Sequence, residues 1–110
     1  LVSETTAKQA PMWCYRRLDK VRVKGRSTTL WILEPLGRWE ALSEEKHQWH
    51  AAFEQALEHY HAADFESAER TFRELDVQDP PTQMYLARIE HFKSAPPQED
   101  WDGVWTHTEK

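Results

Sequence analysis

The stretch Leu18-Asp19-Lys20-Val21-Arg22-Val23-Lys24-Gly25-Arg26 decides the fold of the first third of this 110-residue chain. Its two valines alternate with three basic residues, which predicts a strand with one buried face and one basic face. Gly25 favours a tight turn, and the β-branched and aromatic residues 28–33 predict the second strand of a β-hairpin. Because Pro35 has no N–H to donate, we expect residues 34–37 to end that strand.

Three amphipathic helices are predicted after the hairpin, because apolar residues there recur at steps of three and four. Ser43, Asp64 and Asp79 precede the three segments and are good N-cap residues. The links are short, so we expect an antiparallel bundle whose third helix covers residues 81–92. The expected apolar faces are Trp49, Ala52, Phe53, Ala56, Leu57 and Tyr60, then Phe65, Ala68, Phe72 and Leu75, then Tyr85, Leu86, Ile89 and Phe92.

Two shorter elements flank these parts. Ser3 is expected to cap a short helix that Pro11 stops. Residues 101–108 have the composition of a strand after an Asp-Gly turn, and two interpretations stay open. This segment either pairs with an open sheet edge or packs its tryptophans on the bundle. The predicted fold class is α+β and mostly α.

Charge is divided unevenly along the chain. Residues 1–36 contain seven Lys and Arg against three Asp and Glu, whereas residues 37–110 contain seven against sixteen, so the net charges are +4 and −9. The opposite signs suggest separate modules, and the larger acidic part argues against a nucleic-acid partner. Cys14 is the only cysteine, so no internal disulfide forms, and it is expected to be a small packed hydrophobe.

We expect a soluble protein of a reducing, cytoplasmic compartment, because the chain has a single cysteine and no apolar run approaches the roughly 18 residues of a membrane span. The opening residues Leu1-Val2-Ser3-Glu4 are typical of the inside of a domain. The chain is therefore expected to be a fragment of a longer protein, whose membrane anchor or sensor would lie upstream.

The helical part resembles a tetratricopeptide repeat at Tyr60, Ala68, Phe72 and Pro80. Only one copy is found, and the turn before Asp64 is one residue shorter than that repeat prefers. Stacked repeats normally bury a continuous core only when about three units are present. We therefore expect a repeat-like hairpin that packs against another element.

An ordered series of short motifs covers nearly the whole chain. The series is Ser3-Glu4 with Thr6, Arg16-Arg17-Leu18-Asp19, Val21, Val23-Lys24-Gly25, Glu34-Pro35-Leu36-Gly37, Asp64-Phe65 with Ala68, Pro80-Pro81 and Trp101-Asp102-Gly103-Val104. It resembles the end of a class III adenylyl cyclase catalytic domain followed by the C-terminal extension of some bacterial cyclases. On this resemblance residues 1–36 belong to the catalytic domain and residues 37–110 form the extension.

The resemblance implies a parent protein in which two cyclase domains pair and convert ATP to cyclic AMP and pyrophosphate with two magnesium or manganese ions. Lys24 matches the basic residue that contacts the triphosphate, and Arg26 is a second candidate. The metal-binding, adenine-selecting and transition-state-stabilising residues of the family have no match here and should lie upstream. The fragment is therefore expected to bind no cofactor, to contain no catalytic residue and to be inactive alone.

The implied partners are the upstream catalytic domain and ATP, and an exposed hairpin edge also favours pairing of two copies. The alternative is a free-standing helical interaction module without nucleotide chemistry. Trp101 and Trp105 either clamp the chain end or mark a contact surface. His47, His50 and Glu54 share one helix face, which is typical of solvated side chains, so no metal site is predicted.

Overall fold

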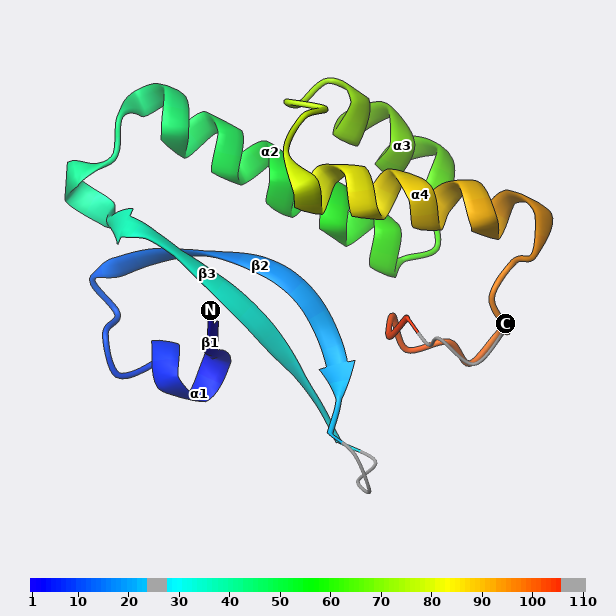
Figure 1. Cartoon of the computed structure of the whole chain (residues 1–110), viewed down its shortest axis with the longest axis horizontal. Coiled ribbons are helices and arrows are strands. Elements are labelled where there is room, and N and C mark those ends of the chain that lie inside the picture. Colours follow the sequence, from blue (N-terminus) through cyan, green and yellow to red (C-terminus); the bar gives the residue numbers. More distant parts are fainter. Residues whose placement is uncertain (24–27, 106–110) are drawn as a thin grey trace. The chain divides into compact units, whose positions relative to one another are not determined.

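The computed structural model describes residues 1–23 and 28–105, and its α+β, mostly helical fold confirms the predicted class. The elements in order are β1 Val2–Ser3, α1 Glu4–Ala7, β2 Trp13–Arg22, β3 Thr29–Arg38, the 3-10 helix η1 Trp39–Ala41, α2 Glu44–His61, α3 Phe65–Arg73 and α4 Pro80–Ser94 (Figure 1). The chain forms two compact units. The sheet unit comprises residues 1–43 with 103–105, and the helical unit comprises residues 44–102.

The sheet unit contains a three-stranded antiparallel sheet in the order β1-β3-β2. Strand β1 was not predicted, and it pairs only Val2 with Leu33 and Ser3 with Ile32. The predicted cap of α1 is confirmed, because the Ser3 side chain accepts a hydrogen bond from the N–H of Thr6. The helix itself ends at Ala7, well before Pro11.

The expectation that residues 34–37 end the second strand is wrong, because β3 continues through them to Arg38. Tyr15 pairs with Pro35 and Cys14 pairs with Gly37, so Leu36 is an extra residue that forms a β-bulge. A bulge is one of the few places where a sheet accepts proline. Strand β1 reaches only as far as Leu33, so Pro35 has a neighbouring strand on one side alone.

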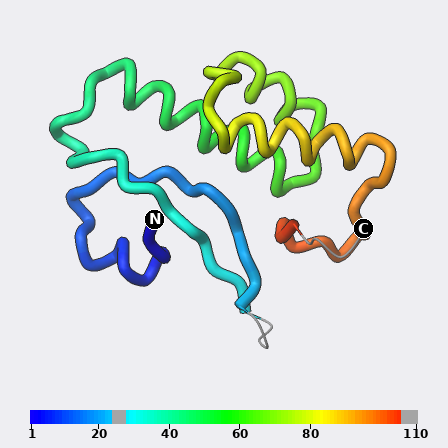
Figure 2. Tube along the Cα trace, in the orientation of Figure 1, coloured from blue at the N-terminus to red at the C-terminus, as the bar shows by residue number. Residues whose placement is uncertain are grey.

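The helical unit consists of α2, α3 and α4, with α2 packed on α3 and α3 on α4 (Figure 2). Two predicted N-caps are confirmed, since the Asp64 side chain accepts from the N–H of Ser67 and that of Asp79 accepts from the N–H of Thr82. The core consists of residues that are at least nine-tenths buried: Phe53, Ala56, Leu57, Tyr60, Ala68, Phe72, Thr82, Tyr85, Arg88, Ile89 and Phe92.

Most residues of the predicted apolar faces are therefore buried, but the residues at the borders of these faces are not. Trp49, Phe65 and Leu86 are only half-buried, whereas Thr82 and Arg88 on α4 were not predicted to be buried. Aromatic rings dominate the packing. Phe72 stacks on Tyr85 with ring centroids 5.3 Å apart, and such pairs add to the stability that the burial of their area provides.

The turn between α2 and α3 is tight because Ala63 adopts a left-handed conformation with φ of 63°. The N–H of Asp64 donates to the carbonyl of His59, and the N–H of Ala63 donates to that of Tyr60. These two bonds form the Schellman arrangement, in which the residue in Ala63's place is usually glycine.

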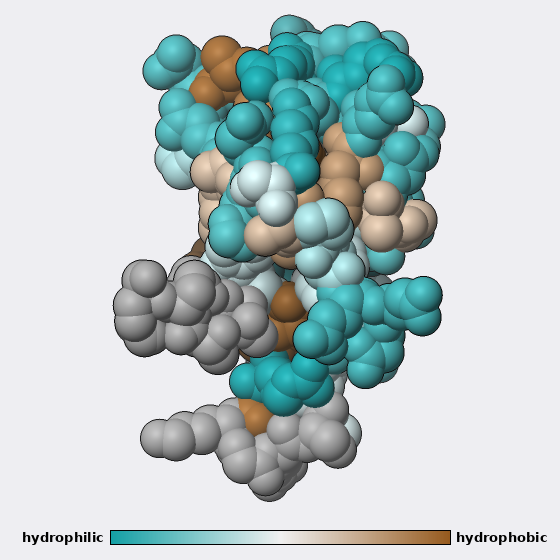
Figure 3. Space-filling view, turned by 90° about the vertical axis from the view of Figure 1, so that its right-hand side faces the viewer, coloured by the Kyte–Doolittle hydropathy of each residue, from teal (hydrophilic) through white to brown (hydrophobic). Residues whose placement is uncertain are grey.

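In a space-filling view, apolar side chains reach the surface between mostly hydrophilic ones (Figure 3).

Candidate functional site

One face of β2 carries three basic side chains because of a second β-bulge. Arg17 pairs with Leu33 and Asp19 pairs with Ile32, so Leu18 is an extra residue between them. Without this bulge, strict alternation would put Arg17 on the face opposite Lys20 and Arg22. The bulge reverses the alternation, and the register places all three basic residues on one face, here called the basic face.

The basic face is supported by aromatic and acidic neighbours. The Arg17 guanidinium lies 4.7 Å from the centre of the Trp31 ring, a distance at which a cation is attracted to an aromatic face. The backbone N–H of Trp31 donates to a carboxylate oxygen of Glu4 over 3.2 Å. Helix α1 is thereby linked to β3, and Arg17 is held against a fixed ring.

The opposite face of the same strand contains an ion pair with a buried arginine. Arg16 is only 3% exposed, and its Nε and Nη2 atoms lie 2.9 Å and 2.7 Å from Oε1 of Glu34, its partner across the strands. Such a charge-assisted pair compensates the burial of the guanidinium. Arg16 therefore has a structural role. Cys14 shares that face and is buried, in agreement with its interpretation as a packed residue.

Lys24 and Arg26, the two predicted triphosphate-binding residues, lie outside the described residues. The chain is described up to Val23 on one side of them and from Thr28 on the other. Arg22 pairs with Thr29, and the N–H of Val23 donates to the carbonyl of Thr28 over 3.4 Å. Arg22 is exposed on the basic face at this end of β2.

The two candidate contact tryptophans have different surroundings. The Trp101 ring lies 5.3 Å from those of Tyr60 and Phe92, so it fastens the segment after α4 to the helical unit. Trp105 is half-buried in a segment that groups with the sheet unit. Residues 101–105 contain no strand, so strand pairing is wrong for this described part, and residues 106–108 lie outside it.

No metal centre is present among the described histidines, cysteines and carboxylates, since no three of them lie close enough together to hold an ion. Nε2 of His50 lies 3.6 Å from Oε2 of Glu54, one helical turn away, which is a local pair on α2. None of the helices in the described ranges combines the length and apolar composition needed to cross a bilayer.

Sequence reasoning identified the basic strand but missed the position of Arg17. No sequence signal marked Leu18 as a bulge, because an apolar residue there fits ordinary alternation equally well. Comparison of the chain with protein-family models, with curated proteins and with solved structures finds no match.

Proposed function

We propose that this chain is the C-terminal part of an adenylyl cyclase, in which the hairpin completes the catalytic sheet and the helical unit is a structural or regulatory extension. The observation that carries the proposal is the basic face of β2. This face leads directly into Val23-Lys24-Gly25, the motif that resembles the triphosphate-contacting hairpin of class III cyclases.

The chemistry of the reaction explains why a basic hairpin is useful. Cleavage of ATP releases pyrophosphate, and negative charge builds up on this leaving group as the bond breaks. A fixed ammonium or guanidinium group stabilises such charge as it develops. In the proposed parent protein, Lys24 supplies this group, while Arg17, Lys20 and Arg22 raise the local concentration of the anionic substrate.

The two divalent ions of the family do not fit the described part of this chain, which offers no group of three suitable ligands. Metal binding is therefore proposed for the preceding part of the parent, and no step of this chain passes through a metal. We expect the isolated chain to produce no cyclic AMP. Turnover by the pure chain in the presence of manganese would contradict this division of labour.

The test is the KM for ATP of the parent protein carrying Lys24→Ala. Loss of a hydrogen bond to a charged group costs roughly 1.5–3 kcal/mol, which corresponds to an increase in KM of about tenfold or more. Lys8→Ala is the matched control, because Lys8 is exposed at the end of α1 and does not belong to the basic face. An unchanged KM in the Lys24 variant would contradict the proposal.

A second candidate function is a free-standing protein-interaction module, and the separate core of the helical unit favours it. Residues 44–102 contain five Lys and Arg against fourteen Asp and Glu, a net charge of −9 that suits a basic partner. This alternative predicts no effect of Lys24→Ala on any nucleotide chemistry. The same experiment therefore separates the two functions.

A further inference from the structure

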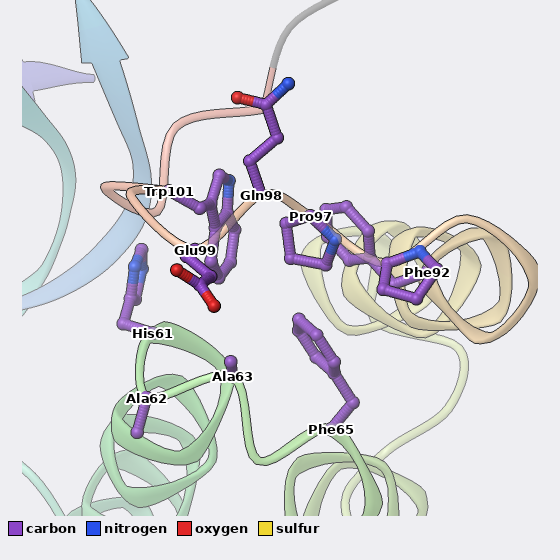
Figure 4. A pocket seen from close by; sticks show the side chains of 10 residues that line it. His61, Ala62, Ala63, Phe65, Phe92, Pro97, Gln98, Glu99 and Trp101 are labelled. Atoms are coloured by element: carbon purple, nitrogen blue, oxygen red, sulfur yellow. The ribbon is translucent and has the colours of Figure 1, made fainter.

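A cavity of about 480 Å³ opens in the helical unit at the end of α2 (Figure 4). Its volume falls within the roughly 300–1,000 Å³ that is usual for small-molecule sites. Its lining includes His61 from α2, Phe65 from α3, Phe92 from α4, and Glu99 and Trp101 from the segment after α4. Four sections of chain thus converge on one space, and none of them belongs to the hairpin.

Four of the ten residues that line this cavity carry aromatic rings, and most of the others are alanines and prolines. The rings of His61 and Trp101 are stacked, with an interplanar angle of 11° and centroids 6.2 Å apart. Phe65 and Phe92 form a second stacked pair at 4.9 Å, and the Trp101 ring lies 5.8 Å from Phe65. Aromatic faces carry partial negative charge, so several of them around one space favour a cation.

The carboxylate of Glu99 points into the space between Trp101, His61 and Phe65 (Figure 4). Within residues 1–23 and 28–105, no side chain forms an ion pair with it. An acid that lines such a cavity without a cationic partner among the described residues suggests that the partner is a ligand. The helical unit's net charge of −9, from five basic and fourteen acidic residues, adds a field that attracts cations and repels anions.

We infer that this cavity binds an organic cation of the alkylammonium class, with its charge between the Glu99 carboxylate and the Trp101 ring. Groups of aromatic rings recognise quaternary ammonium ligands in other proteins, and the Glu99 carboxylate adds an opposite charge to this cavity. A hard metal ion requires several oxygen ligands, which this cavity does not provide. The inference goes beyond the proposed function and does not depend on it.

The experiment uses the full 110-residue chain and follows the tryptophan indole N–H signals by NMR during titration with choline chloride. Trp101→Phe identifies the signal of Trp101. The comparison ligand is 3,3-dimethylbutan-1-ol, which has the shape of choline without its charge. We expect choline to shift the Trp101 signal saturably and the neutral alcohol to bind several-fold more weakly. Equal binding of the two would overturn the inference, because it would show a merely apolar cavity.

The decisive variant is Glu99→Gln, which removes the charge from an exposed side chain and is expected to leave the fold intact. We expect choline affinity to fall about two- to fivefold, the range for a solvent-accessible ion pair. Glu90→Gln is the matched control, since Glu90 is an exposed acid on α4 that does not line the cavity. Unchanged affinity in Glu99→Gln would overturn the inference.

A second variant tests the aromatic wall. Trp101→Leu should weaken choline binding about two- to thirtyfold, the range for cation–π attraction, with its helix content checked by circular dichroism. A peptide whose only charged side chain is one trimethyllysine distinguishes a free metabolite from a side chain of a partner protein. Binding of either choline or the peptide, weakened by Glu99→Gln, supports the inference. Failure of both ligands to bind the wild-type chain would contradict it.

Discussion

The sheet unit and the helical unit differ in how much of their stability is internal. Phe53, Tyr60 and Phe72 of the helical unit are fully buried, and their rings contact one another through Tyr85. In the described part of the sheet unit, the buried hydrophobic residues are Ala7, Cys14, Leu33 and Val104, which are small or aliphatic. Because large buried rings stabilise a fold most, the helical unit should carry its own stability.

The sheet unit contains few strands of its own. Strand β1 contributes only two residues, which leaves mainly the ribbon of β2 and β3. A two-stranded ribbon is marginally stable without further strands or a covering helix. This contrast agrees with the proposal that the hairpin belongs to a larger catalytic sheet and that the helical unit folds independently of it.

The largest effect is expected from Phe72→Ala, which should destabilise the helical unit by about 3–5 kcal/mol. Phe72 is fully buried, stacks on Tyr85 and meets the edge of Phe53, so its removal leaves a cavity in the aromatic core. Urea unfolding followed by circular dichroism measures the loss. Val77→Ala is the control, because Val77 is 43% exposed. Equal stability of the two variants would refute an aromatic core.

Glu34→Gln should destabilise the sheet unit by about 2 kcal/mol, because it removes the charged partner of a buried guanidinium. Arg16 has 4% of its side chain exposed, whereas Glu34 has 37% exposed. The destabilisation therefore comes mainly from leaving the buried Arg16 guanidinium without a charged partner. Hydrogen exchange of β2 amides would measure it without interference from the helices. Glu40→Gln at an exposed site should change little. Unchanged exchange in Glu34→Gln would contradict a structural role of the pair.

Ala63→Gly should stabilise the helical unit by roughly 0.5–1 kcal/mol, since glycine adopts the left-handed conformation without steric cost. Among the described residues, Ala63 is the only non-glycine residue with a positive φ. The matched substitution Ala62→Gly, next to it, should instead destabilise the unit. Thermal unfolding of the two variants measures the difference. A lower melting temperature for Ala63→Gly would show that the turn differs from the one described.

The smallest effect concerns pH. Hydrogen bonds from Lys93 and Arg73 lower the pKa of Glu69 below its usual value of 4.5. A carboxyl whose pKa is lower in the folded state stabilises the fold above the unfolded pKa. Its contribution is lost as pH falls through the folded value. The wild-type chain should therefore lose more stability than Glu69→Gln when the pH is lowered from about 5 to 3. Parallel pH profiles of the two proteins in urea unfolding would contradict this.

The helices were predictable from sequence because their signals are local. Asp64 and Asp79 cap α3 and α4 through residues three positions away, and Tyr60 and Phe72 follow helical spacing. The bulges were not predictable, because they depend on the register between two strands. Leu18 and Leu36 each shift the register by one residue in compensating directions, and no local pattern distinguishes them from paired residues.

The candidate sites likewise combine features that local sequence patterns predict with features that depend on tertiary structure. Alternation predicted that Lys20 and Arg22 share a face, but the addition of Arg17 depends on the bulge at Leu18. The cavity at the end of α2 was not predicted, although Trp101 was recognised as an unexplained aromatic residue. Its proximity to His61 and Phe65 results from the way the segment after α4 returns to the helices, which is a tertiary property.

The most direct test of the central claim is cyclic AMP production by the upstream catalytic segment of the parent, expressed without these residues and then mixed with this chain. If the hairpin completes the catalytic sheet, adding the chain should restore activity. The same chain with Lys24→Ala should restore much less, whereas Lys8→Ala should restore as much as the wild type. Binding of the chain without any restoration of activity would contradict the claim.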